Sequence, residues 1–104
     1  MWELIDTAQH DEFEVRFYVA PEQYSPDDYF DDDGETARLV ADGLYQWFIA
    51  RVAVFKAGVE LGNAYLGACC YESPAQFLDS IYYRDMVAEA FAEARAQLVA
   101  LNRI

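Results

Sequence analysis

The sequence predicts an α+β fold in a single domain over residues 1–104. We expect a three-stranded antiparallel sheet packed against a long C-terminal helix, with short helices in an acidic N-terminal excursion. Two observations predict the sheet: strict alternation of apolar residues in 13–20, and an apolar, aromatic run in 45–55. A third predicts the helix, because apolar residues after Tyr83 recur at steps of four and three. With 104 residues, 55% of them hydrophobic, the chain is long enough to bury a two-layer core.

The first predicted strand is FEVRFYVA, residues 13–20. Its alternation places four apolar side chains on one side of an extended chain: Phe13, Val15, Phe17 and Val19. In the connection that follows, Ser25-Pro26 and two aspartates have the pattern of an N-cap, a proline at N1 and acids in the first turn, which predicts a helical turn. ETARLVADGL, residues 35–44, predicts a second short helix that ends near Gly43.

The second half of the chain predicts a long hairpin. YQWFIARVAVF, residues 45–55, is aromatic or β-branched on both faces, so we place it at the centre of the sheet. KAG supplies the turn, and VELGNAYLGACCY, residues 59–71, returns as its partner. Gly62-Asn63 and Gly67 mark a bulge or a close approach of backbones within that strand.

Two helices are predicted after the hairpin. Ser73-Pro74 repeats the N-cap and N1 pattern and starts a short helix through Leu78. A long helix runs from Tyr83 to about Asn102. Its expected apolar stripe consists of Val87, Phe91, Ala94, Leu98 and Leu101.

The negative charge of the chain is concentrated in its first part. The formal net charge is −12, and residues 1–42 hold thirteen of the 19 acidic residues but only two of the seven basic ones. SPDDYFDDDGE, residues 25–35, has six acidic side chains and two aromatic rings. Such asymmetry suggests an acidic surface directed at a cationic partner. It argues against direct binding of nucleic acid or of an anionic membrane, both of which repel it.

No feature of the sequence predicts export or membrane insertion. The first residues lack a positive segment followed by an apolar one, and no apolar run approaches the roughly 20 residues that cross a bilayer. We therefore expect a soluble cytoplasmic protein. The adjacent Cys69 and Cys70 are badly placed to form a disulfide, and we interpret them as small apolar residues in a reducing compartment.

The sequence offers no catalytic or metal-binding motif, so we expect neither an enzyme nor a cofactor. His10 is the only histidine, and no local pattern joins it to a nucleophile. The segment DDYFDDDGE resembles a calcium loop only superficially. If Gly34 is aligned with the loop glycine, Tyr29 and Val40 fall at the first and last positions, where carboxylates are required.

The functional hypothesis that remains is imitation of nucleic acid. Carboxylates along short helices and loops lie roughly 5 to 6 Å apart, comparable with the spacing of successive phosphates, so they fit a Lys/Arg groove. The aromatic residues would add apolar anchors. The candidate partner-binding residues are Glu22, Tyr24, Asp27, Asp28, Tyr29, Phe30, Asp31, Asp32, Asp33, Glu35 and Asp42.

Solubility is the competing explanation for these residues. In it, the aromatic rings fold back onto the sheet and the carboxylates only keep the protein in solution. However, a net charge of −12 on this chain exceeds the roughly 2 to 8 units that suffice for a small soluble domain. This excess offsets the ordinary preference for solubility, and both explanations stay open.

Several segments together resemble the small accessory proteins of phages and conjugative plasmids. These are the acidic N-terminal half, WF near the start of the central strand, the arm GVELG...YLGACCYES and the helix YYRDMVAEAFAEARAQL. That group includes anti-CRISPR and other anti-defence inhibitors, several of which mimic nucleic acid. The resemblance implies stoichiometric binding to the basic nucleic-acid-binding surface of a host defence complex, with a CRISPR effector as first candidate. It implies a bacterial cytoplasm, no cofactor and no turnover.

The alternative is a protein-interaction module of a mobile element. Such a module would form a homodimer through the aromatic residues of 45–55 or 81–83, and its acidity would serve solubility.

Overall fold

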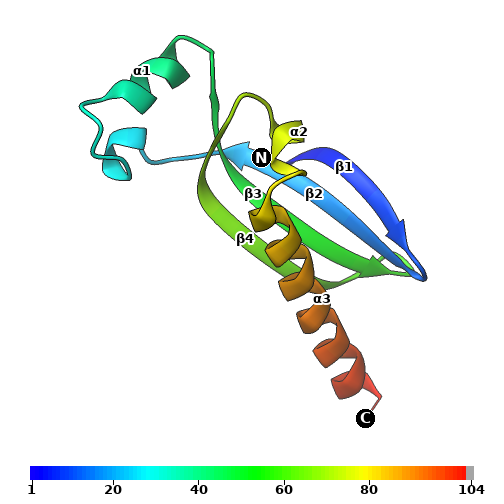
Figure 1. Cartoon of the computed structure of the whole chain (residues 1–104). Coiled ribbons are helices and arrows are strands. Elements are labelled where there is room, and N and C mark those ends of the chain that lie inside the picture. The colour runs from blue at the N-terminus through cyan, green and yellow to red at the C-terminus, as the bar shows by residue number, and fades with distance from the viewer. Residues whose placement is uncertain (103–104) are drawn as a thin grey trace.

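The computed structural model describes residues 1–102 and contains one antiparallel sheet whose strands follow the order β1-β2-β3-β4 (Figure 1). The strands are β1 (Glu3–His10), β2 (Phe13–Pro21), β3 (Gln46–Lys56) and β4 (Val59–Tyr71). The helices are the 3-10 turn η1 (Pro26–Asp28), α1 (Glu35–Ala41), α2 (Pro74–Phe77) and α3 (Ile81–Leu101). The α+β class is confirmed, and every predicted strand and helix is present within a few residues of its predicted bounds.

The prediction of three strands was wrong, because β1 forms a fourth strand at the edge of the sheet. It pairs antiparallel with β2, with a register shift between Leu4 and Asp6. In β1 only Ile5 packs against the core, and most of the strand is exposed. An edge strand with little buried surface needs no apolar alternation. The polar sequence of β1 therefore lacks the pattern from which a strand is predicted.

The β3–β4 hairpin is long and irregular, as predicted. Ala57 and Gly58 in its turn have φ of 50° and 78°, the left-handed conformation that suits the right-handed twist of the two strands. Two register shifts interrupt the pairing, one beside Leu61 and one at Gly67-Ala68. Ala68 has a φ of 57°, so the second bulge holds a non-glycine residue in the left-handed region.

Helix α3 lies directly on the backbone of β4 at Gly62. A Cβ atom at this position would be 2.9 Å from the backbone nitrogen of Ala94 and closer still to the carbonyl oxygen of Ala90. Both alanines are fully buried, and Met86 one turn earlier is buried with them. The predicted close approach at Gly62 is therefore confirmed, and its partner is the C-terminal helix.

The predicted apolar stripe of α3 was only partly right. The buried line is Met86, Ala90 and Ala94, while Val87, Phe91 and Leu98 pack beside it and remain partly exposed. Leu101 was predicted to be in the core but is 54% exposed. The close contact at Gly62 explains the difference, because only small side chains fit between the two backbones and larger ones are displaced to the flanks.

Aromatic side chains fill the core at the end of the sheet where α3 begins. Phe77 of α2 is fully buried, stacks on Phe17 at 5.5 Å between ring centroids, and meets Tyr71 edge-on at 5.2 Å. Ser80 then caps α3 by accepting a hydrogen bond from the backbone N–H of Tyr83 at 3.2 Å. The short helix α2 thus closes the core and sets the start of α3.

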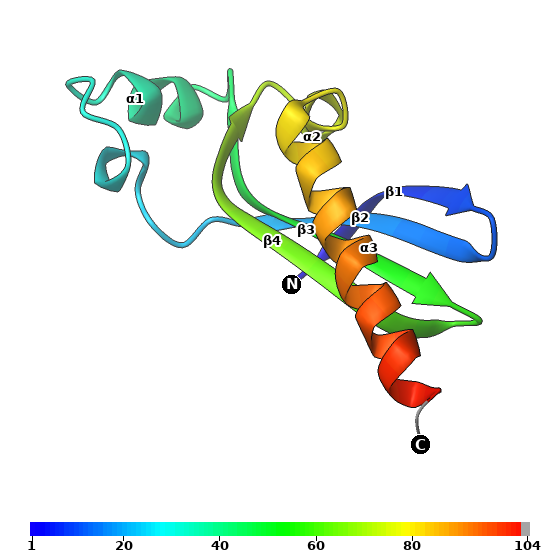
Figure 2. The same ribbon diagram turned by 60° about the horizontal axis from the view of Figure 1, so that its bottom comes forward.

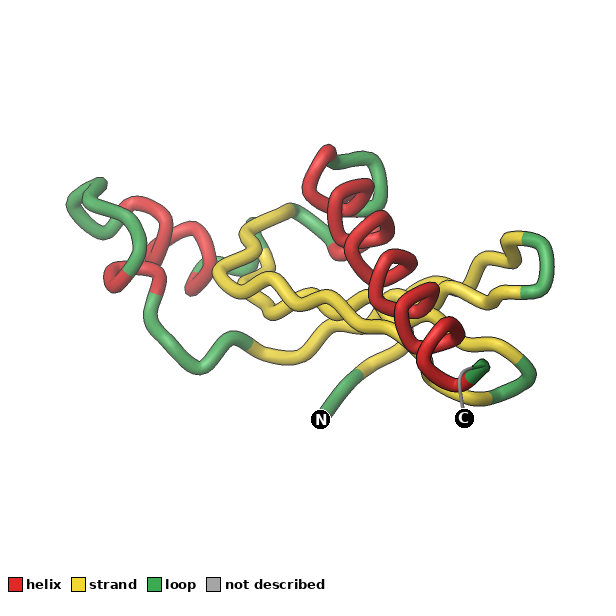
Figure 3. The backbone as a smooth tube through the Cα atoms, turned by 90° about the horizontal axis from the view of Figure 1, so that it is seen from below, coloured by secondary structure: helices red, strands yellow, loops and turns green. Residues whose placement is uncertain are grey.

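The molecule is elongated, with principal extents of 54 × 25 × 22 Å. Helix α3 crosses one face of the sheet. The turn η1 and helix α1 project from the end of the molecule that lies away from the C-terminal end of α3 (Figures 2 and 3). No helix in residues 1–102 combines the length and apolarity that crossing a membrane requires.

Replacing Gly62 with Ala tests the helix-sheet contact. The added methyl group overlaps the α3 backbone, so we expect a loss of at least about 2 kcal/mol in the free energy of unfolding, measured with urea. Gly67→Ala is the comparison, because its Cβ would meet a side-chain atom, Oε2 of Glu22 at 3.0 Å, and no helix backbone, so it should cost less than Gly62→Ala. Equal losses for the two variants would contradict this packing.

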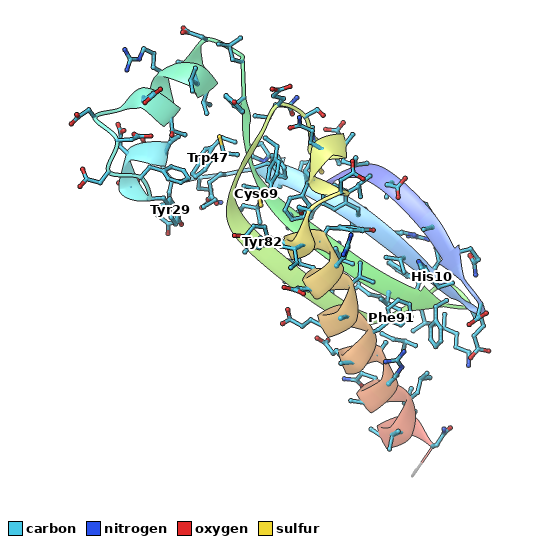
Figure 4. The ribbon with its side chains drawn as sticks, viewed as in Figure 1. His10, Tyr29, Trp47, Cys69, Tyr82 and Phe91 are labelled. Atoms are coloured by element: carbon cyan, nitrogen blue, oxygen red, sulfur yellow. The ribbon has the colours of Figure 1, made fainter. Side chains whose placement is uncertain are left out.

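Replacing Phe77 or Phe91 with Ala compares a fully buried phenylalanine with a partly buried one. Phe77 is fully buried, so its truncation should cost about 3 to 5 kcal/mol. Phe91 is half-buried between Phe13 and His10, at the surface end of the core (Figure 4), so its loss should be clearly smaller but still above about 1 kcal/mol. A larger loss at Phe91 than at Phe77 would refute the assignment.

Candidate partner-binding site

The acidic excursion, which we define as residues 22–44, joins β2 to β3 and carries all the candidate binding residues. It leaves the sheet after Pro21, and η1 and α1 lie beyond the end of the strands (Figure 1). The carboxylates on it are therefore carried away from the core. Their individual contacts divide them into two groups.

Trp47 of β3 attaches the acidic excursion to the sheet. Its indole N–H donates a hydrogen bond to the carbonyl oxygen of Tyr24 at 2.6 Å. The rings of Tyr29 and Phe30 lie 5.7 and 5.9 Å from the indole (Figure 4). Tyr24 and Tyr29 also contact each other edge-on. The rings of Tyr29 and Phe30 thus pack on Trp47, while Tyr24 binds it through its carbonyl oxygen, and all three residues keep exposed rings. The sequence places Trp47 in the strand but gives no sign of this anchoring role.

Three of the eight candidate carboxylates have structural partners, and Glu22 is the first. Its Oε2 atom accepts a hydrogen bond from the backbone N–H of Ala68 at 2.8 Å, across the bulge of β4. Its Oε1 atom accepts from the N–H of Gln23. Glu22 therefore stabilises the left-handed conformation of Ala68 and is turned toward the sheet.

Asp28 closes a capping box at η1. Its carboxylate accepts from the N–H of Ser25 at 3.1 Å, and the Ser25 hydroxyl accepts from the N–H of Asp27. Pro26 at the first position of the turn is buried. The predicted N-cap is confirmed, and Asp28 is occupied by it.

Asp32 fixes the start of α1. Its Oδ2 atom accepts hydrogen bonds from the backbone N–H of Thr36, at 3.2 Å, and from the Thr36 hydroxyl. These bonds lower the pKa of the Asp32 carboxyl, since they favour its charged form. Gly34 between the two residues has a φ of 78° and no side chain that could cap the helix. Asp32 therefore supplies the cap.

The remaining five carboxylates have no such structural role. All are exposed, and within residues 1–102 none makes a side-chain hydrogen bond or an ion pair. They are Asp27, Asp31, Asp33, Glu35 and Asp42. The one cation of the acidic excursion is Arg38, so the negative charge of this segment is largely uncompensated.

Two cavities flank the base of the acidic excursion. One of about 420 Å³ is lined by Pro21, Val40 and Trp47 among others, and one of about 320 Å³ by Phe30, Cys70 and Tyr82. Neither contains a free carboxylate of the excursion or a histidine. They are open hollows beside the projecting segment, and the larger one also includes the polar side chains of Glu3 and Gln46.

Residues of other reactive types belong to other segments of the chain. His10 is exposed at the end of β1, 5.9 Å from the ring of Phe91. Cys69 and Cys70 are free thiols, and burial raises the pKa of Cys69 to about 11, which keeps it protonated at neutral pH. In the part of the chain that the structure describes, no three His, Cys, Asp or Glu side chains are arranged to hold a metal ion.

Comparison with known protein families, with characterised proteins and with solved structures finds no match for this chain.

Neutralising Asp32 or Asp33 tests the division of the carboxylates into those that stabilise the fold and those without a structural partner. Asp32→Asn removes the charged acceptor of Thr36 and should lower the melting temperature, whereas Asp33→Asn should not, because Asp33 is exposed and Asn tolerates its φ of 57°. The pKa of Asp32 is lowered in the folded state. Its contribution is therefore complete above the ordinary pKa of 3.8 and is lost as the pH falls through the lowered value.

Thermal unfolding monitored by circular dichroism at pH 7 and near pH 2 checks both statements. We expect the difference between the Asn variants at pH 7 to shrink as the pH is lowered and the Asp32 carboxyl takes up its proton. Equal melting temperatures at pH 7 would show that Asp32 does not hold α1.

Proposed function

We propose that the protein is a non-catalytic inhibitor that blocks a basic nucleic-acid-binding surface by presenting carboxylates in place of phosphates. The observation that supports this proposal most is the set of five exposed, unpaired carboxylates on a segment that projects from the sheet. An acidic run that served only the fold would have its charges engaged in caps and pairs, as Glu22, Asp28 and Asp32 are.

The sign of the charge selects the class of partner. With a net charge of −12, the molecule repels nucleic acid and anionic lipid and attracts a surface rich in Lys and Arg. Surfaces that bind nucleic acid have this character, because they neutralise a row of phosphates. A protein of this kind binds its target stoichiometrically and competes with the nucleic acid.

The contacts within the acidic excursion reduce the number of residues that we propose to touch the partner. We assign charge recognition to Asp27, Asp31, Asp33, Glu35 and Asp42, and apolar contact to the exposed parts of Tyr24, Tyr29 and Phe30. Trp47 holds these rings in place, which reduces the entropy lost when a partner binds them. Glu22, Asp28 and Asp32 act on the fold and leave the direct contact to the other residues.

The choice of target rests on the resemblance to anti-defence proteins of phages and plasmids. A CRISPR effector of a bacterial host, in the cytoplasm, is the first candidate. Such complexes hold nucleic acid in positively charged channels, and a projecting set of carboxylates suits these channels.

Two charge variants test the proposal. The first, Asp27→Asn, Asp31→Asn and Asp33→Asn, removes three free carboxylates of the acidic excursion. The matched control, Asp85→Asn, Glu89→Gln and Glu93→Gln, removes three exposed charges of α3. Displacement of fluorescently labelled target DNA from purified CRISPR surveillance complexes is the measurement.

The unaltered protein and the α3 variant should displace the DNA, and the excursion variant should do so at least about tenfold less well. Displacement should weaken with added salt, less steeply for the excursion variant. Equal displacement by both variants would refute mimicry by this segment, and no displacement by the unaltered protein would remove the candidate target. Loss of binding on truncation of Tyr82 alone would favour the interaction-module alternative.

A further inference from the structure

No helix of the described chain covers the face of the sheet opposite α3, where only the N-terminal residues cross (Figures 2 and 3). A solvated sheet face ordinarily alternates with the buried one by carrying polar residues. Here the alternation places aromatic and aliphatic side chains on the outer face as well. We call this surface the open face. Its apolar members are Trp2, Leu4, Tyr18, Ile49, Phe55 and Tyr65.

An arginine organises the centre of the open face. Arg51 lies between Tyr18 and Tyr65 in the register of neighbouring strands, and its guanidinium carbon is 5.0 and 5.9 Å from their ring centroids. The indole of Trp2 lies 5.8 Å from the same atom and 6.0 Å from the ring of Tyr65. The N-terminal residues therefore cross the sheet to complete an aromatic cluster around one cation.

This cluster extends along the sheet toward Arg16. The Arg16 guanidinium stacks on the ring of Phe55 at 4.0 Å. Ala53, which pairs with Arg16 in the register, is fully buried but lies outside the core beneath α3. It is covered by the long side chains of the open face. The open face is thus an ordered, packed surface with exposed apolar parts.

The open face carries balanced charge, unlike the rest of the molecule. Arg16 pairs with Glu14, and Arg51 pairs with Glu60 and also donates to the Asn63 side chain at 3.1 Å. Two cations thus meet two carboxylates on a protein whose formal net charge is −12. Repulsion between two copies is weakest where such a neutral surface meets another.

We propose that the open face is a homodimer interface, and that its occupant is the open face of a second copy of this chain. A two-fold interface brings the same patch together from both sides, so it must be self-complementary. A patch with apolar rings at its centre and equal numbers of Arg and Glu satisfies that condition. Trp, Tyr and Arg are also the residues in which interface binding energy concentrates.

The charges argue against other occupants. A basic partner finds no unpaired carboxylate among these Arg–Glu pairs and is drawn to the acidic excursion instead. Nucleic acid would find rings for stacking, but both guanidinium groups are already engaged and the molecule as a whole repels phosphate. The dimer is independent of the inhibitor function proposed above, because it uses a different surface.

Sedimentation equilibrium of the full chain tests the proposal. Over about 1 μM to 1 mM protein, the mass should rise from 11.9 kDa toward twice that value. Added salt should strengthen the dimer, since it screens the repulsion between two acidic molecules. Target binding through the acidic excursion should change in the opposite direction with salt, so the two proposals fail separately.

A matched pair of tyrosines locates the interface. Tyr65 on the open face is 59% exposed and Tyr82 on α3 is 56% exposed, so Tyr65→Lys and Tyr82→Lys change the same residue type and the same charge at similar exposure. Tyr65→Lys should raise the dimer dissociation constant at least about tenfold, and Tyr82→Lys should leave it unchanged. Far-ultraviolet circular dichroism checks that both variants fold.

If Tyr65→Lys does not fold, Leu4→Lys replaces it, with Leu44→Lys of the acidic excursion as its control, since both leucines are exposed. The proposal is overturned if the unaltered protein keeps a mass of 11.9 kDa over the whole range. It is also overturned if both lysine variants of a pair dissociate alike, or if salt weakens the dimer.

Discussion

The contact between Gly62 and the backbone of α3 is the constraint on which the rest of the structure depends. Without a side chain at this position, β4 and the helix approach until Ala90 and Ala94 are fully buried. The approach fixes the helix over β3 and β4, so its larger apolar residues fill the flanks. Helix α3 therefore covers one face of the sheet at close distance, and no helix covers the opposite face.

A second consequence concerns the acidic excursion. Because α2 and α3 close the core without it, this segment is free to project from the sheet. Two devices still hold its base: the indole of Trp47, which contacts three of its residues, and Glu22, which binds the bulge at Ala68. Both act where the excursion leaves the strands. The free carboxylates farther out are therefore oriented by a fixed base.

Electrostatics separates the two surfaces to which we assign partners. The acidic excursion has unpaired carboxylates and so attracts cations at long range, with a strength that salt screens. The open face has paired charges and exposed rings, so it acts at short range through apolar contact. An inhibitor that binds a basic groove with one surface can therefore self-associate through the other. The two proposals use different residues and different forces.

The sequence by itself determined the α+β class, the strands at 13–20 and 45–55, the cap at Ser25, the start of α2 at Ser73-Pro74 (where Ser73 makes no side-chain capping bond), and the segment that holds the charge. These follow from periodicity and local hydrogen bonding, which act over a few neighbouring residues. Only the tertiary structure decided which carboxylates are free, because Glu22 is engaged by Ala68, far along the chain. It also decided that β1 joins the sheet, because an edge strand leaves little apolar pattern to detect. It likewise decided that alanines of α3 face β4, because a close helix contact also leaves little apolar pattern.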